Sequence, residues 1–344
     1  MTTHLRYSLA FLFSQAIFCY SQNPQLDLSG IRIMFYNVEN LFHPENDSLK
    51  SDDDFTKDGP RHWNYTKYQK KINQIAQNVI AIGEWEPPAV IGLCEVENLQ
   101  CLKDLIFNSP LSTFNYQIVH QESGDKRGID VAFLVRSEFF QIIEYKAFVL
   151  DFPNSSSATR DILYMKGLTG QDTLHCLVNH WPSRYGGELA TKPKRNFAAS
   201  ILRSKFDSIQ NITPSAKIIA MGDFNDYPTD ESMKDILSAK KDTNNITLTD
   251  LINLTWQYEK TTGTNKYQHE WHILDQFIIN QTLLESNESL YTSFHLSHIF
   301  KASWLFTDEA DGFGKKPFRT YNGFKYIGGY SDHLPIYTDI LFIK

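Results

Sequence analysis

The sequence predicts a mixed α/β protein in which sheets and helices pack as layers around one core. Three observations give this prediction. The chain has 344 residues, of which 42% are hydrophobic, so it can bury a sizeable core. Short apolar runs have strand character, and apolar residues at helical spacing lie between them. The two kinds of segment do not alternate strictly, which favours layered packing. No Pro- or Ser-rich linker divides the chain, so we expect one domain over residues 28–344.

The first residues resemble an export signal. His4 and Arg6 form a thin charged region, residues 7–20 are mostly apolar, and the small residue Ser21 precedes a polar stretch. The apolar run is shorter than the roughly 20 residues that cross a bilayer, so no stable membrane span is expected. We expect a signal peptide over residues 1–21 and a periplasmic or extracellular mature protein. A buried N-terminal helix is the alternative, and lipid attachment at Cys19 fits less well because Phe18 is bulky.

Further along the chain, eight apolar runs are expected to form strands and two segments to form helices. The helices are expected at residues 68–80, with apolar residues at a spacing of three and four, and at residues 195–209. The strands are expected at residues 31–36, 89–93, 130–136, 162–168, 174–179, 217–221, 274–279 and 336–343.

Polar residues recur at the ends of these expected strands. Strands hold side chains rigidly while the loops beyond them give access, so polar groups that gather at one rim of a sheet indicate a functional site. One such residue alone is usually a turn or a cap, and the inference depends on the whole ordered set. The set consists of Asn37, Glu95, Asn179, His180, Asp223, Asn225, Asp275, Ser331, Asp332 and His333.

These residue types suit a metal-dependent phosphoryl site. Carboxylates such as Glu95 and Asp223 are hard oxygen ligands for Mg²⁺ or Mn²⁺, which bind through one or two carboxylates, waters and phosphate oxygens. The cation then acts as a Lewis acid on the phosphoryl group. An imidazole beside a carboxylate can move a proton near neutral pH.

The ordered motifs resemble those of the endonuclease/exonuclease/phosphatase superfamily, which includes pancreatic-type deoxyribonucleases, exonuclease III and neutral sphingomyelinases. The resemblance covers nearly the whole mature chain. It is carried by Gly-Asp-Phe-Asn at 222–225 followed about 110 residues later by Ser-Asp-His at 331–333, just before the last expected strand. Asn-Val-Glu-Asn-Leu-Phe at 37–42 and Arg-Gly-Ile-Asp-Val at 127–131 are similar to an exported bacterial branch.

The resemblance implies a four-layer α/β sandwich, with two packed β-sheets flanked by helices. It also implies roles for the site residues. Glu95 resembles the metal ligand, with Asn37 its neighbour and Asp332 on the metal side. Asp223 and Asn225 resemble the pair that positions water and phosphate. His333 with its partner Asp275 resembles the base or phosphate-binding dyad, His180 the histidine at the leaving group, and Arg160 and Asn179 are expected to contact substrate.

The sequence departs from the family pattern at three places. Cys94 stands where many members have Gln before the metal-binding Glu. Glu97 competes with Glu95 for that role, since an extended segment would point both the same way. A pairing of Asp130 with His180 is a loose assignment. The signature of inositol polyphosphate phosphatases is absent, with Trp-His-Ile-Leu-Asp at 271–275 in its place.

The expected function is metal-dependent phosphodiester hydrolysis, with nucleic acid as the leading substrate and a monomer as the expected state. The net charge of −7 argues against a tight nucleic-acid binder and less strongly against a nuclease that turns over. A lipid phosphodiesterase or phosphomonoesterase of the same fold remains open, as does a non-catalytic surface binding protein. The four cysteines have no metal-type spacing, and without Cys19 three remain, which allow at most one disulfide.

Overall fold

Strand β1 (Gly30–Leu41) lies in the middle of one large sheet and separates two cores. Its side chains alternate, so Ile33 and Phe35 face a core between two sheets while Met34 and Tyr36 face helix α1 (Tyr65–Gly83). These facts come from a computed structural model that describes residues 30–342 except 153–157, 245, 248, 260, 285–288 and 311. The expected signal peptide lies outside the described residues.

The first sheet contains seven strands in the order β14-β20-β1-β2-β4-β3, with β15 also paired to β20. Strands β1 and β2 are parallel, whereas β4 and β20 run antiparallel to their neighbours β2 and β1. The other strands of this sheet are β2 (Val90–Val96), β3 (Tyr116–His120), β4 (Asp130–Arg136), β14 (Leu290–Tyr291), β15 (Ser297–Ile299) and β20 (Ile336–Phe342).

The second sheet also contains seven strands, in the order β5-β6-β7-β8-β13-β10-β9. Its central strands β7 and β8 are parallel to each other. The strands are β5 (Gln141–Phe148), β6 (Ile162–Thr169), β7 (Asp172–His180), β8 (Lys217–Asp223), β9 (Ala239–Lys240), β10 (Leu251–Asn253) and β13 (Asp275–Asn280).

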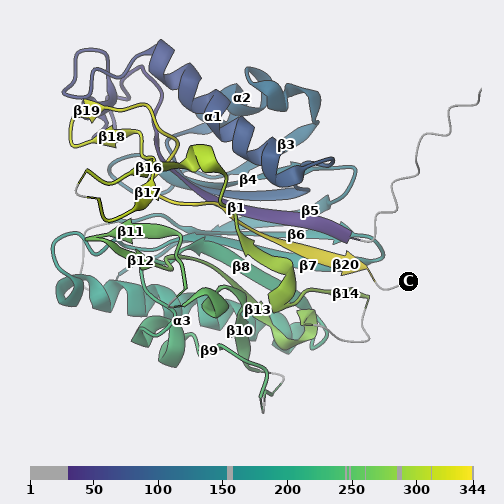
Figure 1. The fold of residues 1–344 in the computed structure, drawn as a ribbon. Helices are drawn as coiled ribbons and strands as arrows, with labels where there is room; N and C mark the ends of the chain where they lie inside the picture. The colour runs from purple at the N-terminus through teal and green to yellow at the C-terminus, as the bar shows by residue number, and fades with distance from the viewer. Residues whose placement is uncertain are drawn as a thin grey trace, which may run out of the picture.

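Helices cover the outer faces of both sheets (Figure 1). Helix α1 and helix α2 (Leu99–Phe107) bury apolar side chains against the first sheet, and helix α3 (Glu188–Ile212) does so against the second. Asparagine caps begin the first two helices, because the Asn64 side chain accepts from Lys67 N and Asn98 from Cys101 N. The layers are therefore helix, sheet, sheet and helix, which confirms the predicted four-layer sandwich.

Three short hairpins lie on one side of the molecule, at the end where β1 finishes (Figure 1). They are β11 (Asn265–Tyr267) with β12 (Glu270–His272), β16 (Phe306–Asp308) with β17 (Lys315–Pro317), and β18 (Tyr321–Asn322) with β19 (Lys325–Tyr326). Single turns complete the fold at η1 (Asp53–Phe55), η2 (Pro110–Thr113), η3 (Ser232–Ile236), η4 (Leu254–Tyr258), η5 (Gln281–Leu283), η6 (Phe294–Leu296) and η7 (Ser303–Leu305).

Two further observations concern compartment and cysteine chemistry. Within the described part of the chain, no helix has the length and apolar character to cross a membrane. Cys94, Cys101 and Cys176 are all buried free thiols, so the described residues contain no disulfide.

Candidate active site

The polar strand ends meet where the two sheets lie against each other. In the first sheet, Asn37 pairs with Cys94, the residue before Glu95. In the second sheet, Asp223 at the end of β8 pairs with His180 on one side and with Asp275 on the other. The register therefore gathers these residues within each sheet, and the Asn37 side chain contacts Asp223 Oδ2 at 3.0 Å across the two sheets.

Glu95 enters this rim through a strained backbone. Its φ is +63°, a region that non-glycine residues rarely adopt and that costs about 1–3 kcal/mol. In this conformation Oε2 accepts a 2.8 Å hydrogen bond from Asn40 N, and Oε1 lies 3.3 Å from Asn37 Nδ2. Glu39, Asn40 and Asn225 also have positive φ, so four such residues gather around the site.

The turn at Glu95 also separates it from Glu97. A register shift between Cys94 and Val96 breaks the regular strand, and Glu97 points into a different environment. There it accepts hydrogen bonds from His43 N and the Asn98 side chain, and burial raises its pKa to about 8. Of the two carboxylates considered from the sequence, the structure places Glu95 at the rim.

Asn37 connects the two sheets at this point. Its Nδ2 donates to Asp223 Oδ2 at 3.0 Å as well as approaching Glu95, while its Oδ1 accepts from Glu39 N at 2.9 Å. The amide thus presents N–H groups to the carboxylates and its oxygen to the backbone. Asn37 thus bridges the Glu95 and Asp223 carboxylates, and its expected role as a metal ligand stays a prediction.

Asp223 is the centre of the cluster. Its Oδ2, which accepts from Asn37, lies 3.8 Å from Nε2 of both His180 and His333. Its Oδ1 accepts a hydrogen bond from Asn225 N at 2.9 Å. Burial raises its pKa to about 7, with His333 opposing the shift and the charge of Asp275 adding to it. A cation at this point would offset the repulsion among the carboxylates.

Asp275 and His333 form a buried dyad. Oδ2 of Asp275 lies 2.7 Å from Nδ1 of His333, and His333 N donates to Ser331 Oγ at 3.1 Å. Burial alone would lower the pKa of His333, but the carboxylates of Asp275 and Asp223 outweigh it and raise the pKa well above its ordinary value. The expected pairing is present in the structure.

His180 approaches Asp223 from the other side. Its Nε2 lies 3.9 Å from Glu95 Oε1, and its buried Nδ1 has no hydrogen-bond partner. Burial, then the positive charges of Arg160 and Arg127, lower its pKa well below the ordinary value, so the ring is neutral at pH 7.

Asp130 does not partner His180. Its Oδ2 lies 3.6 Å from His120 Nε2, and its Oδ1 accepts from Ser123 N. The loose assignment from the sequence was wrong, because Asp130 begins β4 and its side chain turns toward β3.

Arg160 lies beside the cluster in a buried ion pair. Its Nη1 donates to Asp125 Oδ2 at 3.0 Å and its Nη2 to Trp181 O at 2.6 Å, while its buried Nε has no partner. Arg127 also contacts Asp125, at 3.2 Å. Sequence reasoning missed Asp125, although its place in Gly-Asp-Lys-Arg, directly before the Arg-Gly-Ile-Asp-Val motif, was a usable signal.

Two asparagines have different positions. Asn225 Nδ2 donates to Trp181 O at 3.0 Å, next to Asp223. Asn179 is fully buried, its Nδ2 faces the carbonyls of Leu177 and Met221, and its Oδ1 accepts from Trp181 Nε1. The expectation that Asn179 contacts substrate is therefore corrected: all its polar atoms are used inside the second sheet.

Asp332 belongs to a network of charges at the edge of the site. Its Oδ2 accepts from Arg319 at 3.1 Å, and Arg319 also donates to Glu39 Oε1 at 3.2 Å. Burial raises the pKa of Glu39 to about 7, with Asp332 adding to the shift, and burial lowers the pKa of Lys71 nearby to about 8. Glu39 and Lys71 were not found from the sequence, where each looks like an ordinary surface charge.

The donor set fits a hard divalent cation. Asp223, Asp275 and His333 offer ligand atoms within 4.8 Å of one another, Asp275 Oδ1 is buried without a partner, and Glu95 adds a fourth side chain. Oxygen-rich sets of this kind suit Mg²⁺ or Mn²⁺.

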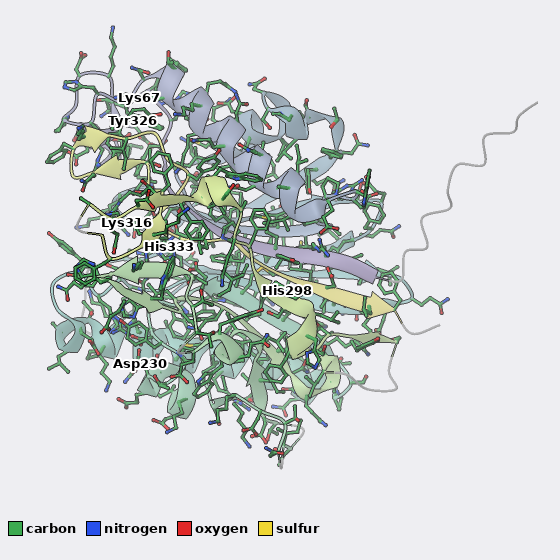
Figure 2. All side chains as sticks on the ribbon, in the orientation of Figure 1. Lys67, Asp230, His298, Lys316, Tyr326 and His333 are labelled. Carbon is green, nitrogen blue, oxygen red and sulfur yellow. The ribbon has the colours of Figure 1, made fainter. Side chains whose placement is uncertain are left out.

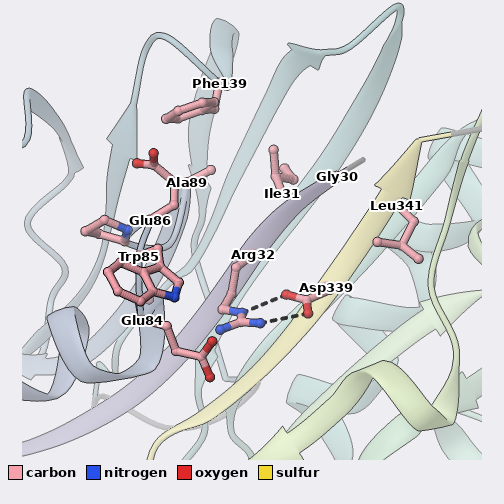
Figure 3. Close-up of a pocket in the computed structure, with 12 residues that line it drawn as sticks. Gly30, Ile31, Arg32, Glu84, Trp85, Glu86, Ala89, Phe139, Asp339 and Leu341 are labelled. Carbon is pink, nitrogen blue, oxygen red and sulfur yellow. Dashed lines mark hydrogen bonds and ion pairs between the residues drawn. The ribbon is translucent and has the colours of Figure 1, made fainter. Parts of the chain in front are cut away.

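One cavity lies far from this cluster, and another lies beside it. One of about 240 Å³, lined by Arg32, Trp85 and Asp339, is at the start of β1, the opposite end from Glu95 (Figure 3). It is too far along the strand to serve the carboxylates. The other, of about 300 Å³, is lined by Arg127, Arg160 and Tyr185 and so borders the site.

Comparison with known proteins finds a matching family and several similar folds. The model of the endonuclease/exonuclease/phosphatase family matches residues 32–341. No curated protein matches in sequence.

Several solved structures are similar in fold. D. rerio TDP2 humanized by 14 mutations is 14% identical, with a TM-score of 0.55 over 91% of this chain and 99% of that chain. D. rerio TDP2 complexed with single strand DNA product is 13% identical, with a TM-score of 0.53 over 91% and 99%. The mannosyl-6-phosphatase of Bacteroides thetaiotaomicron VPI-5482 is 16% identical, with a TM-score of 0.53 over 91% and 100%.

Proposed function

Because the chain belongs to the endonuclease/exonuclease/phosphatase family of phosphoester hydrolases, we propose that it is an exported, Mg²⁺- or Mn²⁺-dependent phosphodiesterase with endonuclease-like action on nucleic acid. The observation that carries the proposal is the position of Asp223 between His180 and His333, with Nε2 of each ring 3.8 Å from its Oδ2. Two imidazoles around one carboxylate supply separate groups for a phosphoryl oxygen and for the leaving oxygen, while the carboxylate serves the attacking water. The enzyme acts as a monomer in this proposal.

Glu95 would hold the cation, with Asp332 on its outer side and phosphate oxygens and waters completing the coordination. When bound, the cation supplies Lewis acidity and neutralises charge on the phosphoryl group. Asn37 holds the Glu95 and Asp223 carboxylates close to each other through its two N–H contacts.

The remaining steps belong to the side chains. A water oriented by Asp223 and Asn225 attacks phosphorus, a new P–O bond forms, and the water proton passes to the Asp223 carboxylate. His333, fixed by Asp275, donates a hydrogen bond to a phosphoryl oxygen. The bond to the leaving oxygen then breaks, the ring N–H of neutral His180 stabilises its charge, and a proton from solvent completes the alcohol.

Exposed aromatic side chains near the rim support a nucleic-acid substrate. Tyr185, which is 93% exposed, follows His180 by five residues, and Tyr267, which is 65% exposed, lies on β11. The first residue of β11, Asn265, pairs with His333, so this hairpin borders the site. Bases of a single strand stack on such rings without sequence preference. Since the net charge is −7, we expect weak binding with turnover rather than a stable complex.

The test uses purified protein with supercoiled plasmid, single-stranded DNA, RNA and bis(p-nitrophenyl) phosphate, each with Mg²⁺ or Mn²⁺ and with EDTA. We expect cation-dependent cleavage that EDTA abolishes, with plasmid nicking as the sign of internal attack. Asp223→Ala and His333→Ala should each lower kcat at least about 10²-fold. Wild-type protein that turns over none of these phosphodiesters with either cation contradicts the proposal.

A control variant at a second histidine distinguishes the loss of the catalytic group from the general effect of removing a histidine. His298 lies on β15, well away from His333, as the labels in Figure 2 show. His298→Ala should keep wild-type turnover. Export is tested separately, since a mature N-terminus near Gln22 in a secreted fraction would support it and retention of Met1 would contradict it.

A phosphomonoesterase is the second candidate, favoured by the cavity beside the site. Its volume of about 300 Å³ and its lining by Arg127 and Arg160 would suit one dianionic sugar phosphate. The similar Bacteroides fold belongs to a mannosyl-6-phosphatase. Hydrolysis of p-nitrophenyl phosphate or a hexose phosphate at far higher kcat/KM than any diester would favour this candidate.

A further inference from the structure

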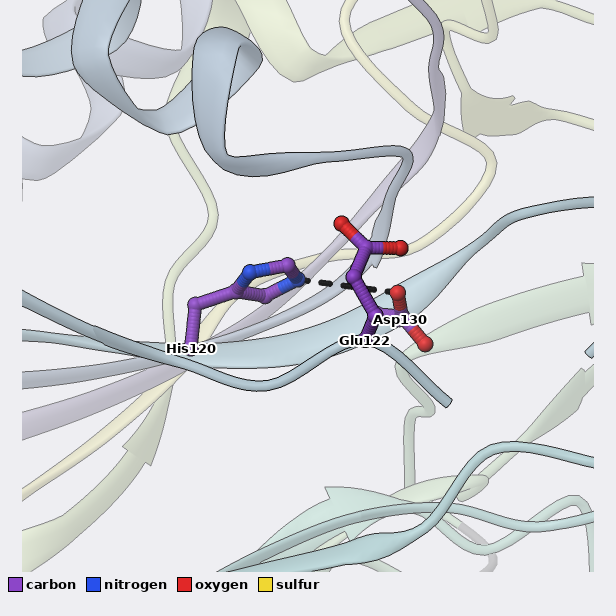
Figure 4. Close-up of side chains that lie close together, drawn as sticks. All are labelled: His120, Glu122 and Asp130. Atoms are coloured by element: carbon purple, nitrogen blue, oxygen red, sulfur yellow. Dashed lines mark ion pairs between the residues drawn. The ribbon is translucent and has the colours of Figure 1, made fainter. Parts of the chain in front are cut away.

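A second group of metal-ligand side chains lies outside the cluster around Asp223. His120 ends β3, Asp130 begins β4, and Glu122 lies in the connection between them. One ligand atom from each of the three lies within 4.8 Å of the others. In Figure 4 the imidazole of His120 points toward both carboxylates.

Two buried atoms in this group lack hydrogen-bond partners. The side chain of His120 is 4% exposed and that of Asp130 is 1% exposed, yet His120 Nε2 and Asp130 Oδ2 are both unpaired. Asp130 Oδ1 already accepts from Ser123 N at 3.0 Å, so its other oxygen remains available. Buried polar atoms without partners are costly, by about 1–3 kcal/mol each, and indicate a missing partner.

The spacing of these atoms suits one ion. His120 Nε2 and Asp130 Oδ2 are 3.6 Å apart, too long for a hydrogen bond. Two ligands that each lie about 2.0–2.2 Å from the same metal ion are separated by about 3–3.5 Å. Lys50 partly offsets the charge of Glu122 at 3.8 Å but satisfies neither of the unpaired atoms.

We propose that His120, Glu122 and Asp130 bind a divalent first-row transition metal, such as Zn²⁺ or Mn²⁺, separate from the ion at Glu95. One imidazole with two carboxylates is a donor set for these ions, because imidazole is a ligand for Zn²⁺ and carboxylate is a ligand for Mn²⁺. Waters complete the coordination.

The ion would clamp the connection at residues 121–129. That connection carries Asp125, which accepts the hydrogen bond from Arg160 Nη1, and Arg127, which contacts the same carboxylate. Closing the base of the β3–β4 hairpin with a metal ion restrains the loop between its strands. The site would therefore position Arg160 without touching substrate.

Zn²⁺ and Mn²⁺ binding to the apo protein tests the proposal by calorimetry. The background is Glu95→Gln with Asp223→Asn, which weakens the catalytic ion site. We expect one remaining equivalent of Zn²⁺ to bind, and its affinity to fall at least about tenfold in His120→Gln and Glu122→Gln. The Glu122 side chain is 51% exposed, so that variant folds even if the buried histidine substitution does not.

Asp235→Asn is the matched control, since Asp235 is an exposed carboxylate on η3, outside this group. It should bind like the background protein. Absence of binding at millimolar Zn²⁺ and Mn²⁺ overturns the proposal, and so does binding that neither His120→Gln nor Glu122→Gln weakens. An ion pair between His120 and Asp130 alone would give the first of these results.

Trypsin reports on the clamped loop directly. Lys126 and Arg127 are exposed cleavage sites within it. In the same background, Zn²⁺ should slow cleavage there at least about tenfold, and Glu122→Gln should remove most of that protection. Equal cleavage rates with and without metal would overturn the clamping role. Neither measurement depends on catalysis, so the outcome is distinct from that of the hydrolase test.

Discussion

Asp275 orients the ring of His333. The 2.7 Å contact between Asp275 Oδ2 and Nδ1 leaves Nε2 facing Asp223 at 3.8 Å, and all three side chains are buried. A carboxylate in this position fixes both the tautomer and the direction of an imidazole. Since Asp275 pairs with Asp223 in the antiparallel register of β13 and β8, the sheet itself sets the geometry.

Replacing Asp275 with asparagine should therefore disable His333 without removing it. The amide N–H would favour the other tautomer, and we expect kcat to fall by about 10²–10⁴-fold. Turnover of bis(p-nitrophenyl) phosphate measures the loss. Asp339→Asn, at the Arg32 ion pair on the far end of β1, is the control and should retain activity. Activity of Asp275→Asn within twofold of wild type would remove the dyad from the mechanism.

The ion pair of Arg160 with Asp125 should show strong coupling. Their side chains are 4% and 7% exposed, so Asp125→Ala leaves a buried guanidinium without its main partner. We expect a cost of about 3 kcal/mol in the free energy of unfolding, measured with urea.

A double-mutant cycle separates this coupling from general loss of packing. Arg160→Met combined with Asp125→Ala should cost less than the sum of the single variants by about 2 kcal/mol. Strict additivity would show that the pair contributes no interaction of its own. Arg127→Met is the matched comparison, because Arg127 contacts the same carboxylate with a side chain that is 49% exposed.

The sequence predicted the long central strands because each is a buried apolar run. All eight predicted runs match a strand of the two large sheets, as β8 illustrates with seven buried residues. It missed β5, whose residues are mostly exposed, and the short hairpins such as β11 with β12. Strands of two or three residues have no readable period, so tertiary contacts decide them.

The candidate site was predictable where it depends on strand ends and less so where it depends on side-chain direction. Adjacent residues of a strand face opposite sides of the sheet, so Asn179 points away from the side that His180 faces. This difference could have been inferred from the sequence. The positive φ of Glu95 could not be inferred, because the strand breaks locally and the sequence pattern does not show such a break. This break separates Glu95 from Glu97. The partner of Asp130 depends on how β3 pairs with β4, which spacing along the chain does not encode.

Asn225 should show a conflict between stability and function. Its φ of +51° disfavours residues with a Cβ, while its side chain donates to Trp181 O beside Asp223. Asn225→Gly should be about 1 kcal/mol more stable than Asn225→Ala in urea unfolding. Both should lose activity, because both lack the amide. Equal stability of the two variants would mean that the turn relaxes and is not strained.

His175 should make stability depend on pH below neutrality. It is 5% exposed, and its Nδ1 lies 2.8 Å from the Tyr164 hydroxyl. Burial, followed by the positive charge of Lys166, lowers its pKa to about 4 from the ordinary 6.5. Between these two pKa values the imidazole is protonated in the unfolded chain and neutral in the folded chain. Stability therefore falls as the pH falls below 6.5.

The expected loss between pH 7.5 and pH 5 is about 1–2 kcal/mol from this group. Other groups titrate in the same range, so the comparison is between proteins and not between pH values alone. His175→Gln should lose less stability than wild type over that interval, by about the same 1–2 kcal/mol. His295→Gln, at an exposed histidine on η6, should follow the wild-type curve. Parallel curves for wild type and His175→Gln would show that the buried ring accepts its proton in the folded state.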